Sequence, residues 1–185
     1  FTAVMQMNQM IPAAVPHSED ISSATQSKSP DTDKSDNASV QTALKQVDIQ
    51  TLEKRGLITD QDTRGVSINF VNVKNITPDM IDEIKKIGNS IYELKLNGQN
   101  TVDDLMASLP TLGNLRKMNL SGSSVSDKGI LQLRKFTALE QLYLYETNIT
   151  DASMEVLGKL NKLRKIYLWH TGVTPEGIRM LKQIK

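Results

Sequence analysis

Apolar residues recur at a fixed spacing in the second half of the chain. The segment LEQLYLYETNIT at residues 139–150 is followed 24 residues later by LRKIYLWHTGVT at residues 163–174. Each copy begins with the pattern leucine-x-x-apolar-x-leucine, and each then places a β-branched residue, Ile149 or Val173, beside a threonine. An internal repeat is therefore the dominant feature of the chain.

The β-branched position also occurs upstream of these two copies. Its members are Ile76, Val102, Val125, Ile149 and Val173, at intervals of 26, 23, 24 and 24 residues. Apolar residues follow five, eight and eleven positions later, a spacing of three that marks one face of a helix. These three columns are Ile81, Ile130, Met154 and Ile178; Ile84, Leu133, Leu157 and Leu181; and Ile87, Phe136, Leu160 and Ile184. The Val102 copy is one residue short here, with Leu109 and Leu112.

Helix starts are marked by hydroxyl residues at the N-cap position and by proline at the next position. The N-cap candidates are Thr77, Ser126, Thr150 and Thr174, and the prolines are Pro78 and Pro175. Each unit is thus a strand, a turn, a helix and a turn, and successive strands must be parallel with right-handed crossovers. We predict an α/β leucine-rich-repeat solenoid of about four to five repeats, a short right-handed horseshoe with strands on the concave face and helices on the convex face.

The composition divides the chain into three parts. Residues 1–40 form an N-terminal segment and a polar linker, in which SSATQSKSPDTDKSDNAS cannot bury enough apolar surface to order itself. Residues 41–75 are predicted to be an N-terminal cap, with a short helix ending at Gly56 and a strand-forming run after it. Residues 76–185 hold the leucine-rich repeats.

Charge and cysteine content exclude several classes of function. The chain has 22 basic and 21 acidic residues, so its balance predicts neither nucleic-acid binding nor attraction to an anionic membrane. It has no cysteine, which rules out disulfides and thiolate metal sites. No apolar run approaches the roughly 18 residues that span a bilayer. Because the chain starts at Phe1 without a signal-like segment, we expect it to be a fragment or a processed form of a longer protein.

The residues between the framework leucines are predicted to point outward from the concave face. In the two C-terminal strands these positions bring Tyr143 beside Tyr167 and Tyr145 beside Trp169, in neighbouring strands about 4.8 Å apart. The same positions in these and the preceding strand hold Lys117, Asn119, Gln141 and Lys165. These eight residues are the candidate binding site. Glu93 and Lys95 lie further along the same face.

Three interpretations of the aromatic positions remain open. They could form a binding site, because exposed contiguous Tyr and Trp side chains often anchor interfaces. They could instead stabilise the sheet as cross-strand pairs. They could also contact a domain or protomer outside this chain.

We find no catalytic or metal-binding motif and expect no cofactor and no enzymatic activity. Asp103 and Asp104 are better explained as charges that complement a helix dipole than as an acid/base pair. TDQDTRG at residues 59–65 lacks the glutamate and the spacing of a calcium loop.

The sequences of the repeats resemble those of one group of bacterial proteins. NLSGSSVSDKGI, LYLYETNITDASM and YLWHTGVTPEGI, together with NFVNVKNIT at residues 69–77, are similar to the leucine-rich C-terminal region of membrane-anchored Bacteroidetes and planctomycete proteins that carry a planctomycete-type cytochrome c domain. The resemblance covers roughly residues 45–185. It implies an extracytoplasmic module, in the periplasm or at the cell surface, of a membrane-anchored parent. It implies no haem in this chain, which lacks Cys-x-x-Cys-His.

The chain departs from that pattern in its turns. The usual asparagine after the strand is replaced by Ser123, Thr147 and Thr171, so their hydroxyls are expected to satisfy the turn amides. Asn100 is expected to keep the asparagine role in its own repeat.

These observations favour a non-enzymatic binding module whose aromatic concave face holds a protein partner. The alternatives are a glycan ligand, or a structural spacer that docks on the upstream haem domain of the same parent protein. We expect no nucleic-acid partner and no membrane insertion by this segment.

Overall fold

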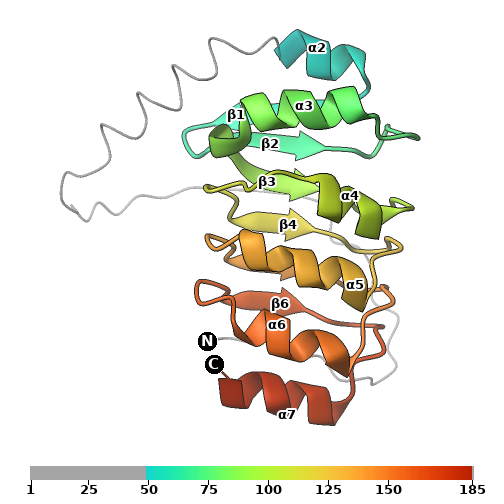
Figure 1. Cartoon of the computed structure of the whole chain (residues 1–185), viewed down its shortest axis with the longest axis vertical. Coiled ribbons are helices and arrows are strands. Elements are labelled where there is room, and N and C mark those ends of the chain that lie inside the picture. The colour runs from blue at the N-terminus through green and yellow to red at the C-terminus, as the bar shows by residue number, and fades with distance from the viewer. Residues whose placement is uncertain (1–48, 185) are drawn as a thin grey trace, which may run out of the picture.

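The computed structural model describes residues 49–184, which form a mixed α/β structure around a six-stranded sheet (Figure 1). The strands follow chain order from β1 to β6. Their bounds are β1 Ile58–Asp62, β2 Gly65–Asn69, β3 Ile91–Lys95, β4 Lys117–Asn119, β5 Gln141–Tyr143 and β6 Lys165–Tyr167. The predicted α/β class is confirmed in this form.

Helices alternate with the strands along the chain from β2 onward, and both are stacked along the long axis of the molecule (Figure 1). The α-helices are α2 Ile49–Lys54, α3 Pro78–Lys86, α4 Val102–Ser108, α5 Asp127–Ile130, α6 Met154–Gly158 and α7 Pro175–Ile184. Short 3₁₀ helices accompany them: η1 Gly88–Ser90, η2 Leu131–Lys135 and η3 Asp151–Ser153. Except for η1, these directly follow α5 or precede α6, so the outer segments of those repeats combine 3₁₀ and α turns.

The N-terminal part differs from the prediction in one element. Residues 1–48, which include the predicted linker and the start of the predicted cap, lie outside the described residues. The predicted helix is present as α2, and Gly56 after it has the left-handed φ of 87° that favours glycine. The strand-forming run is β2, which ends at Asn69 because the Asn69 side-chain oxygen accepts a hydrogen bond from Val71 N at 3.0 Å. The sequence analysis missed β1, which pairs with β2 as an antiparallel hairpin across TDQDTRG.

From β2 to β6 the strands are parallel and in the predicted register. Glu93, Lys117, Gln141 and Lys165 form one row across the sheet. Lys95, Asn119, Tyr143 and Tyr167 form the next row. The repeat length sets this register, because a 24-residue unit returns the same position to the neighbouring strand.

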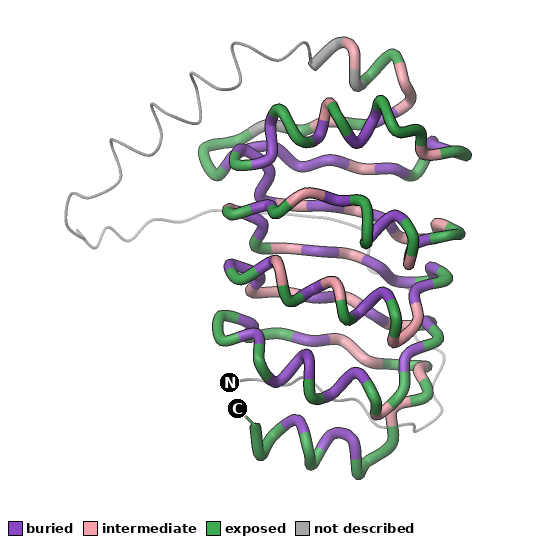
Figure 2. Tube along the Cα trace, viewed as in Figure 1, coloured by how far each residue is buried: buried purple, intermediate pink, exposed green. Residues whose placement is uncertain are grey.

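The core consists of the repeated apolar columns, buried between the strands and helices (Figure 2). Leu94, Met118 and Leu142 are completely buried, and so are the anchors Val102, Val125 and Ile149. The helical columns are buried as predicted, with one exception. Ile184 is 40% exposed, whereas Leu160, its counterpart one repeat earlier, is 4% exposed.

A ladder of aspartates joins one repeat to the next. Asp103 accepts hydrogen bonds from Ser126 N at 2.9 Å and from Ser126 Oγ at 2.5 Å. Asp127 accepts from Thr150 N at 2.9 Å and from Thr150 Oγ1 at 2.7 Å. Each carboxylate therefore binds the N-cap residue of the following repeat, which fixes where the next helix begins. The sequence analysis assigned Asp103 a dipole role and overlooked this contact.

The ladder has a third rung and ends at a proline. Asp151 accepts from Thr174 N at 2.8 Å and from Thr174 Oγ1 at 2.6 Å. The residue after Thr174 is Pro175, which has no carboxylate to offer a further repeat. Pro78 holds the same position after Thr77 in the first repeat.

Three of the four predicted N-cap residues also cap their helix through the side chain. The side chain of Ser126 accepts from Lys128 N, and that of Thr150 accepts from Ala152 N. Thr174 Oγ1 accepts from Gly177 N at 3.3 Å. Thr77 is the N-cap residue of α3, as predicted, but its side chain makes no such bond.

The ladder also explains the small residues three positions after each N-cap. A Cβ at Gly129 would lie 2.2 Å from Asp103 Oδ1, and one at Gly177 would lie 2.0 Å from Asp151 Oδ1. In the middle repeat the residue is Ser153, whose hydroxyl donates a very short hydrogen bond to Asp127. The carboxylate thus packs against a site that holds only glycine or serine.

The turn hydroxyls act as predicted in two repeats. Ser123 Oγ donates to Leu120 O at 2.6 Å and accepts from Val125 N at 3.4 Å. Thr171 makes the equivalent pair of bonds, to Leu168 O at 2.8 Å and from Val173 N at 3.4 Å.

The prediction for Asn100 was wrong. Gln99, not Asn100, occupies the position equivalent to Ser123, three residues after the last strand leucine. Its side-chain Nε2 donates to Phe70 O of the preceding turn at 2.9 Å, whereas Asn100 is exposed. The extra residue in the NGQN turn shifts the register by one position.

We predict that Gly177→Ala destabilises the protein, although alanine is the better helix former. The added Cβ would overlap the Asp151 carboxylate, and overpacking of this kind costs about 1–3 kcal/mol of unfolding free energy. Urea denaturation measures the change. Gly113→Ala is the matched control, because its Cβ would meet only the flexible Asn89 side chain at 3.3 Å. Equal stabilities of the two variants would contradict the ladder packing.

A second prediction concerns acid stability. Burial raises the pKa of Asp127, but the hydrogen bonds from Ser153 and Thr150 outweigh burial, so the pKa lies below its usual value. This contribution to stability is therefore fully present above the unfolded pKa of about 3.9 and is lost as pH falls through the lower folded pKa. Asp127→Asn should be less stable than wild type at pH 6, and the gap should narrow towards pH 3. A gap that stays constant with pH in urea titrations would show that the carboxylate charge has no role.

Candidate functional site

The predicted aromatic residues meet across β5 and β6. The Tyr143 and Tyr167 rings are stacked, with centroids 4.5 Å apart and an interplanar angle of 4°. The Tyr145 and Trp169 rings, just beyond the ends of these strands, are 6.4 Å apart and tilted by 48°. We call these four residues the aromatic face.

The aromatic face is neither fully buried nor fully exposed. Trp169 is 50% exposed, and the three tyrosines are half-buried. Burial raises the pKa of the Tyr143 phenol, and the neighbouring Tyr167 adds to this rise. Because β6 is the last strand of the described sheet, no strand covers the outer side of Tyr167 and Trp169. Accessible ring surface is therefore concentrated on β6.

The polar members of the predicted site lie on the same rows of the sheet. They differ in whether their side chains already have partners within the described residues. Gln141 Oε1 accepts from Tyr143 Oη at 3.4 Å, which ties it to the aromatic face. Lys117 and Lys165 flank Gln141 in the sheet, and neither forms an ion pair within residues 49–184. The Asn119 side-chain oxygen accepts from Ser121 N at 3.0 Å, so this atom serves the turn after β4.

Ser121 holds the position equivalent to Tyr145 and Trp169, which follow one and two repeats later, as the 24-residue period shows. Ser121 itself is only 3% exposed. Its hydroxyl has no hydrogen-bond partner within the described part of the chain. In this third row, a ligand can therefore reach Tyr145 and Trp169 but not Ser121.

The turn after each strand from β3 to β6 contains a residue in the left-handed conformation, and here sequence analysis missed a feature of the site. In the first two such turns this residue is glycine, Gly98 and Gly122, with φ of 70° and 63°. In the two turns beside the aromatic face it is Glu146 and His170, with φ of 57° and 52°. A side chain in this region costs about 1 kcal/mol, so both turns beside the aromatic face are strained, as is Thr101 before α4, with φ of 60°. The column of Gly, Gly, Glu and His was a visible signal in the sequence.

Both strained residues contact the site. The His170 ring stacks on Trp169 with centroids 3.9 Å apart and an angle of 25°. Glu146 Oε1 lies 3.9 Å from His170 Nδ1, close enough to pair with a protonated imidazole. The aromatic face thus continues into a polar edge at the end of β6.

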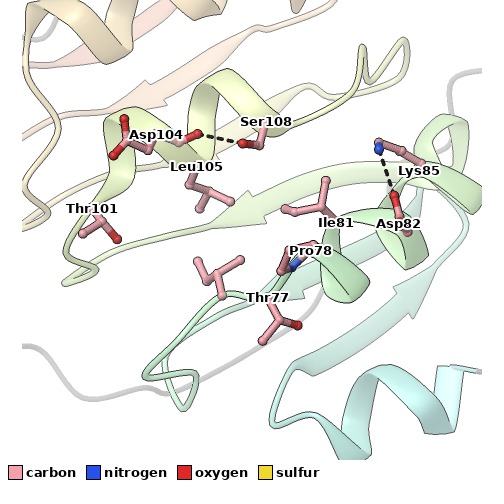
Figure 3. A pocket seen from close by; sticks show the side chains of 10 residues that line it. Thr77, Pro78, Ile81, Asp82, Lys85, Thr101, Asp104, Leu105 and Ser108 are labelled. Atoms are coloured by element: carbon pink, nitrogen blue, oxygen red, sulfur yellow. Dashed lines mark hydrogen bonds and ion pairs between the residues drawn. The ribbon is translucent and has the colours of Figure 1, made fainter.

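A groove between α3 and α4 is a second concave feature (Figure 3). Its volume is roughly 410 Å³, and Pro78, Ile81 and Leu105 form its apolar part. The groove lies at the joint where Pro78 replaces the ladder aspartate. Its charged side chains already have partners, because Lys85 pairs with Asp82 at 2.8 Å and Asp104 faces Lys128 at 3.8 Å. Nothing in it forms a catalytic arrangement.

Two further searches concern residues 49–184 only. No group of three or more His, Asp or Glu side chains there is arranged to hold a metal ion. No helix in this range is both long and apolar enough to cross a membrane.

Comparisons with known proteins find similarity among solved structures. No protein-family model matches the chain, and no curated protein matches it. Among solved structures, an internalin from Listeria monocytogenes is similar over 61% of this chain, with 14% sequence identity and a TM-score of 0.31. The matched region spans 50% of the internalin chain.

The strained turns generate a prediction. Glu146→Gly and His170→Gly should each raise the free energy of unfolding by roughly 0.5–1 kcal/mol, because glycine adopts the left-handed conformation without strain. Chemical denaturation measures the gain. Glu155→Gly in α6 is the control and should lose about 1 kcal/mol, because glycine weakens a right-handed helix. Loss of stability in all three variants would refute the assigned strain.

Proposed function

We propose that this chain is a leucine-rich-repeat solenoid that acts as a non-enzymatic binding module, with the aromatic face as its site for a protein partner. The supporting observation is the exposed ring surface on β6. Trp169 is half exposed beside Tyr145, in a position where two earlier repeats have the small polar residues Asn97 and Ser121. Tyr and Trp are the side chains that most often anchor protein interfaces.

The strained turns support the same proposal. Glu146 and His170 retain a conformation that glycine adopts more easily, and His170 packs directly on Trp169. Strain that persists beside an exposed aromatic cluster is typical of sites selected for contact rather than for stability. The charged groups Lys117 and Lys165 lie at the border of the face and would set the orientation of a partner.

The resemblance of the repeats supplies the partner to test first. We propose a planctomycete-type cytochrome c domain of the same parent protein as that partner, in an extracytoplasmic location. The module would then position the redox domain, and it would itself need no cofactor. A glycan is the competing ligand, because flat tyrosine faces such as the stacked Tyr143 and Tyr167 pair also suit sugar rings.

Isothermal titration of the chain with such a cytochrome c domain tests the proposal. Tyr145→Ala combined with Trp169→Ala should weaken binding by about 100-fold or more, since anchor residues of this kind contribute about 2 kcal/mol or more. Lys95→Ala combined with Asn97→Ala is the matched control on the same side of the sheet, and it should change affinity by less than about threefold.

A parallel titration with a digest of extracellular polysaccharide separates the two ligands. Trp169 is the only tryptophan, so its emission reports directly on the aromatic face. A saturable shift with the digest alone would replace the protein partner by a glycan. Unchanged emission with both ligands, or full affinity in the Tyr145→Ala, Trp169→Ala variant, would contradict the proposed site.

A further inference from the structure

The last repeat leaves an apolar surface uncovered. Val156 and Leu160 of α6 are 2% and 4% exposed. Their counterparts 24 residues later are Met180 and Ile184 of α7, and these are 41% and 40% exposed. Trp169, two residues beyond the end of β6 in the same repeat, is 50% exposed. We call Trp169, Met180 and Ile184 the end surface.

The chemistry that joins the repeats does not continue past the end surface. Asp127 and Asp151 each bind the N-cap of the following repeat, but the equivalent residue in the last repeat is Pro175. Where Pro78 takes this position earlier in the chain, the groove between α3 and α4 follows. A repeat does follow Pro78, so the missing aspartate alone does not decide the occupant of the end surface.

The charges in the last repeat indicate the chemistry of an occupant that would fit the end surface. Residues 159–185 contain seven Lys and Arg residues but one acidic residue, Glu176. Four exposed cations of this region form no ion pair with any described residue: Lys162, Arg164, Lys165 and Lys182. In the preceding repeats Arg116 and Glu140 neutralise one another at 2.6 Å, and Arg164 is the unmatched next member of that column. An apolar and acidic polypeptide fits this surface.

We propose that residues 1–36 of this same chain occupy the end surface. Residues 1–16 carry no charged side chain and include Val4, Met5, Met7, Met10 and Ile11. The acidic residues that follow are Glu19, Asp20, Asp31, Asp33 and Asp36. The apolar part would cover Met180 and Ile184, and the acidic part would lie along the unpaired cations. The net positive charge of the repeats and the net negative charge of the N-terminal segment are thus complementary.

The connecting chain is long enough for this contact. Residues 37–48 connect the docked segment to α2, and twelve extended residues reach roughly 40 Å. Five strand spacings separate β1 from β6, which is about 24 Å. A tether that reaches across its span gives an effective concentration in the millimolar range, so a weak contact suffices.

The proposal does not depend on the function proposed above, but the two meet at Trp169. A docked N-terminal segment would cover the outer side of Trp169 and compete with a partner for it. The segment would then act as an internal competitor that any partner must displace.

Acrylamide quenching of Trp169 in the full-length chain is the first test. Val4→Asp combined with Met7→Asp should at least double the Stern–Volmer constant and shift the emission to the red, and 0.5 M NaCl should act in the same direction on wild type. Gln26→Asp combined with Ser29→Asp is the control and should leave Trp169 as shielded as in wild type. Equal quenching of wild type and the Val4→Asp, Met7→Asp variant would overturn the proposal.

Disulfide trapping provides a readout that does not depend on Trp169. The chain has no cysteine, so a Met7→Cys, Met180→Cys pair can be introduced without competition. At low protein concentration it should form at least fivefold more intramolecular disulfide than Met7→Cys with Leu131→Cys, whose second position is 45% exposed on η2. Equal yields, or a disulfide formed only between chains, would overturn docking of the segment on its own end surface.

Discussion

Each repeat of this chain completes the burial of its apolar columns against the repeats on either side, so stability depends on the joints between them. The aspartate ladder fixes those joints. Asp103, Asp127 and Asp151 each bind the N-cap residue of the next repeat through its amide and its hydroxyl. One side chain thus sets both the start of a helix and its distance from the previous one. The requirement for glycine or serine three residues later follows from the space that the carboxylate occupies.

The ladder also explains where the structure changes character. At Pro78 the carboxylate is missing, Thr77 makes no side-chain cap and a groove opens between α3 and α4. At Pro175 the carboxylate is missing again, and Met180 and Ile184 of the same helix are exposed. The two prolines therefore bound a central block, from α4 to α7, in which the aspartates join the repeats.

The aromatic face lies within that coupled block, on its last two strands. A rigid frame beneath it holds the Tyr143 and Tyr167 rings parallel, and it supports the strain at Glu146 and His170. Binding residues on a well-ordered sheet lose little entropy when a partner arrives. The joints, the strained turns and the exposed rings are thus parts of one arrangement. The aspartate ladder stabilises the frame, and this stability offsets the strain in the two turns beside Trp169.

The repeat period was enough to predict the α/β class, the parallel register and the pairing of Tyr143 with Tyr167 and of Tyr145 with Trp169. This was possible because a fixed period places equivalent residues on neighbouring strands, whatever the surroundings. The period could not reveal β1, the burial of Ser121 or the contact from Asp103 to Ser126, which depend on atoms brought together from different repeats. Nor could a balanced total charge reveal the unpaired cations of the last repeat. Ion pairing and exposure are properties of neighbours in space, and only the tertiary structure decides which neighbours each residue has.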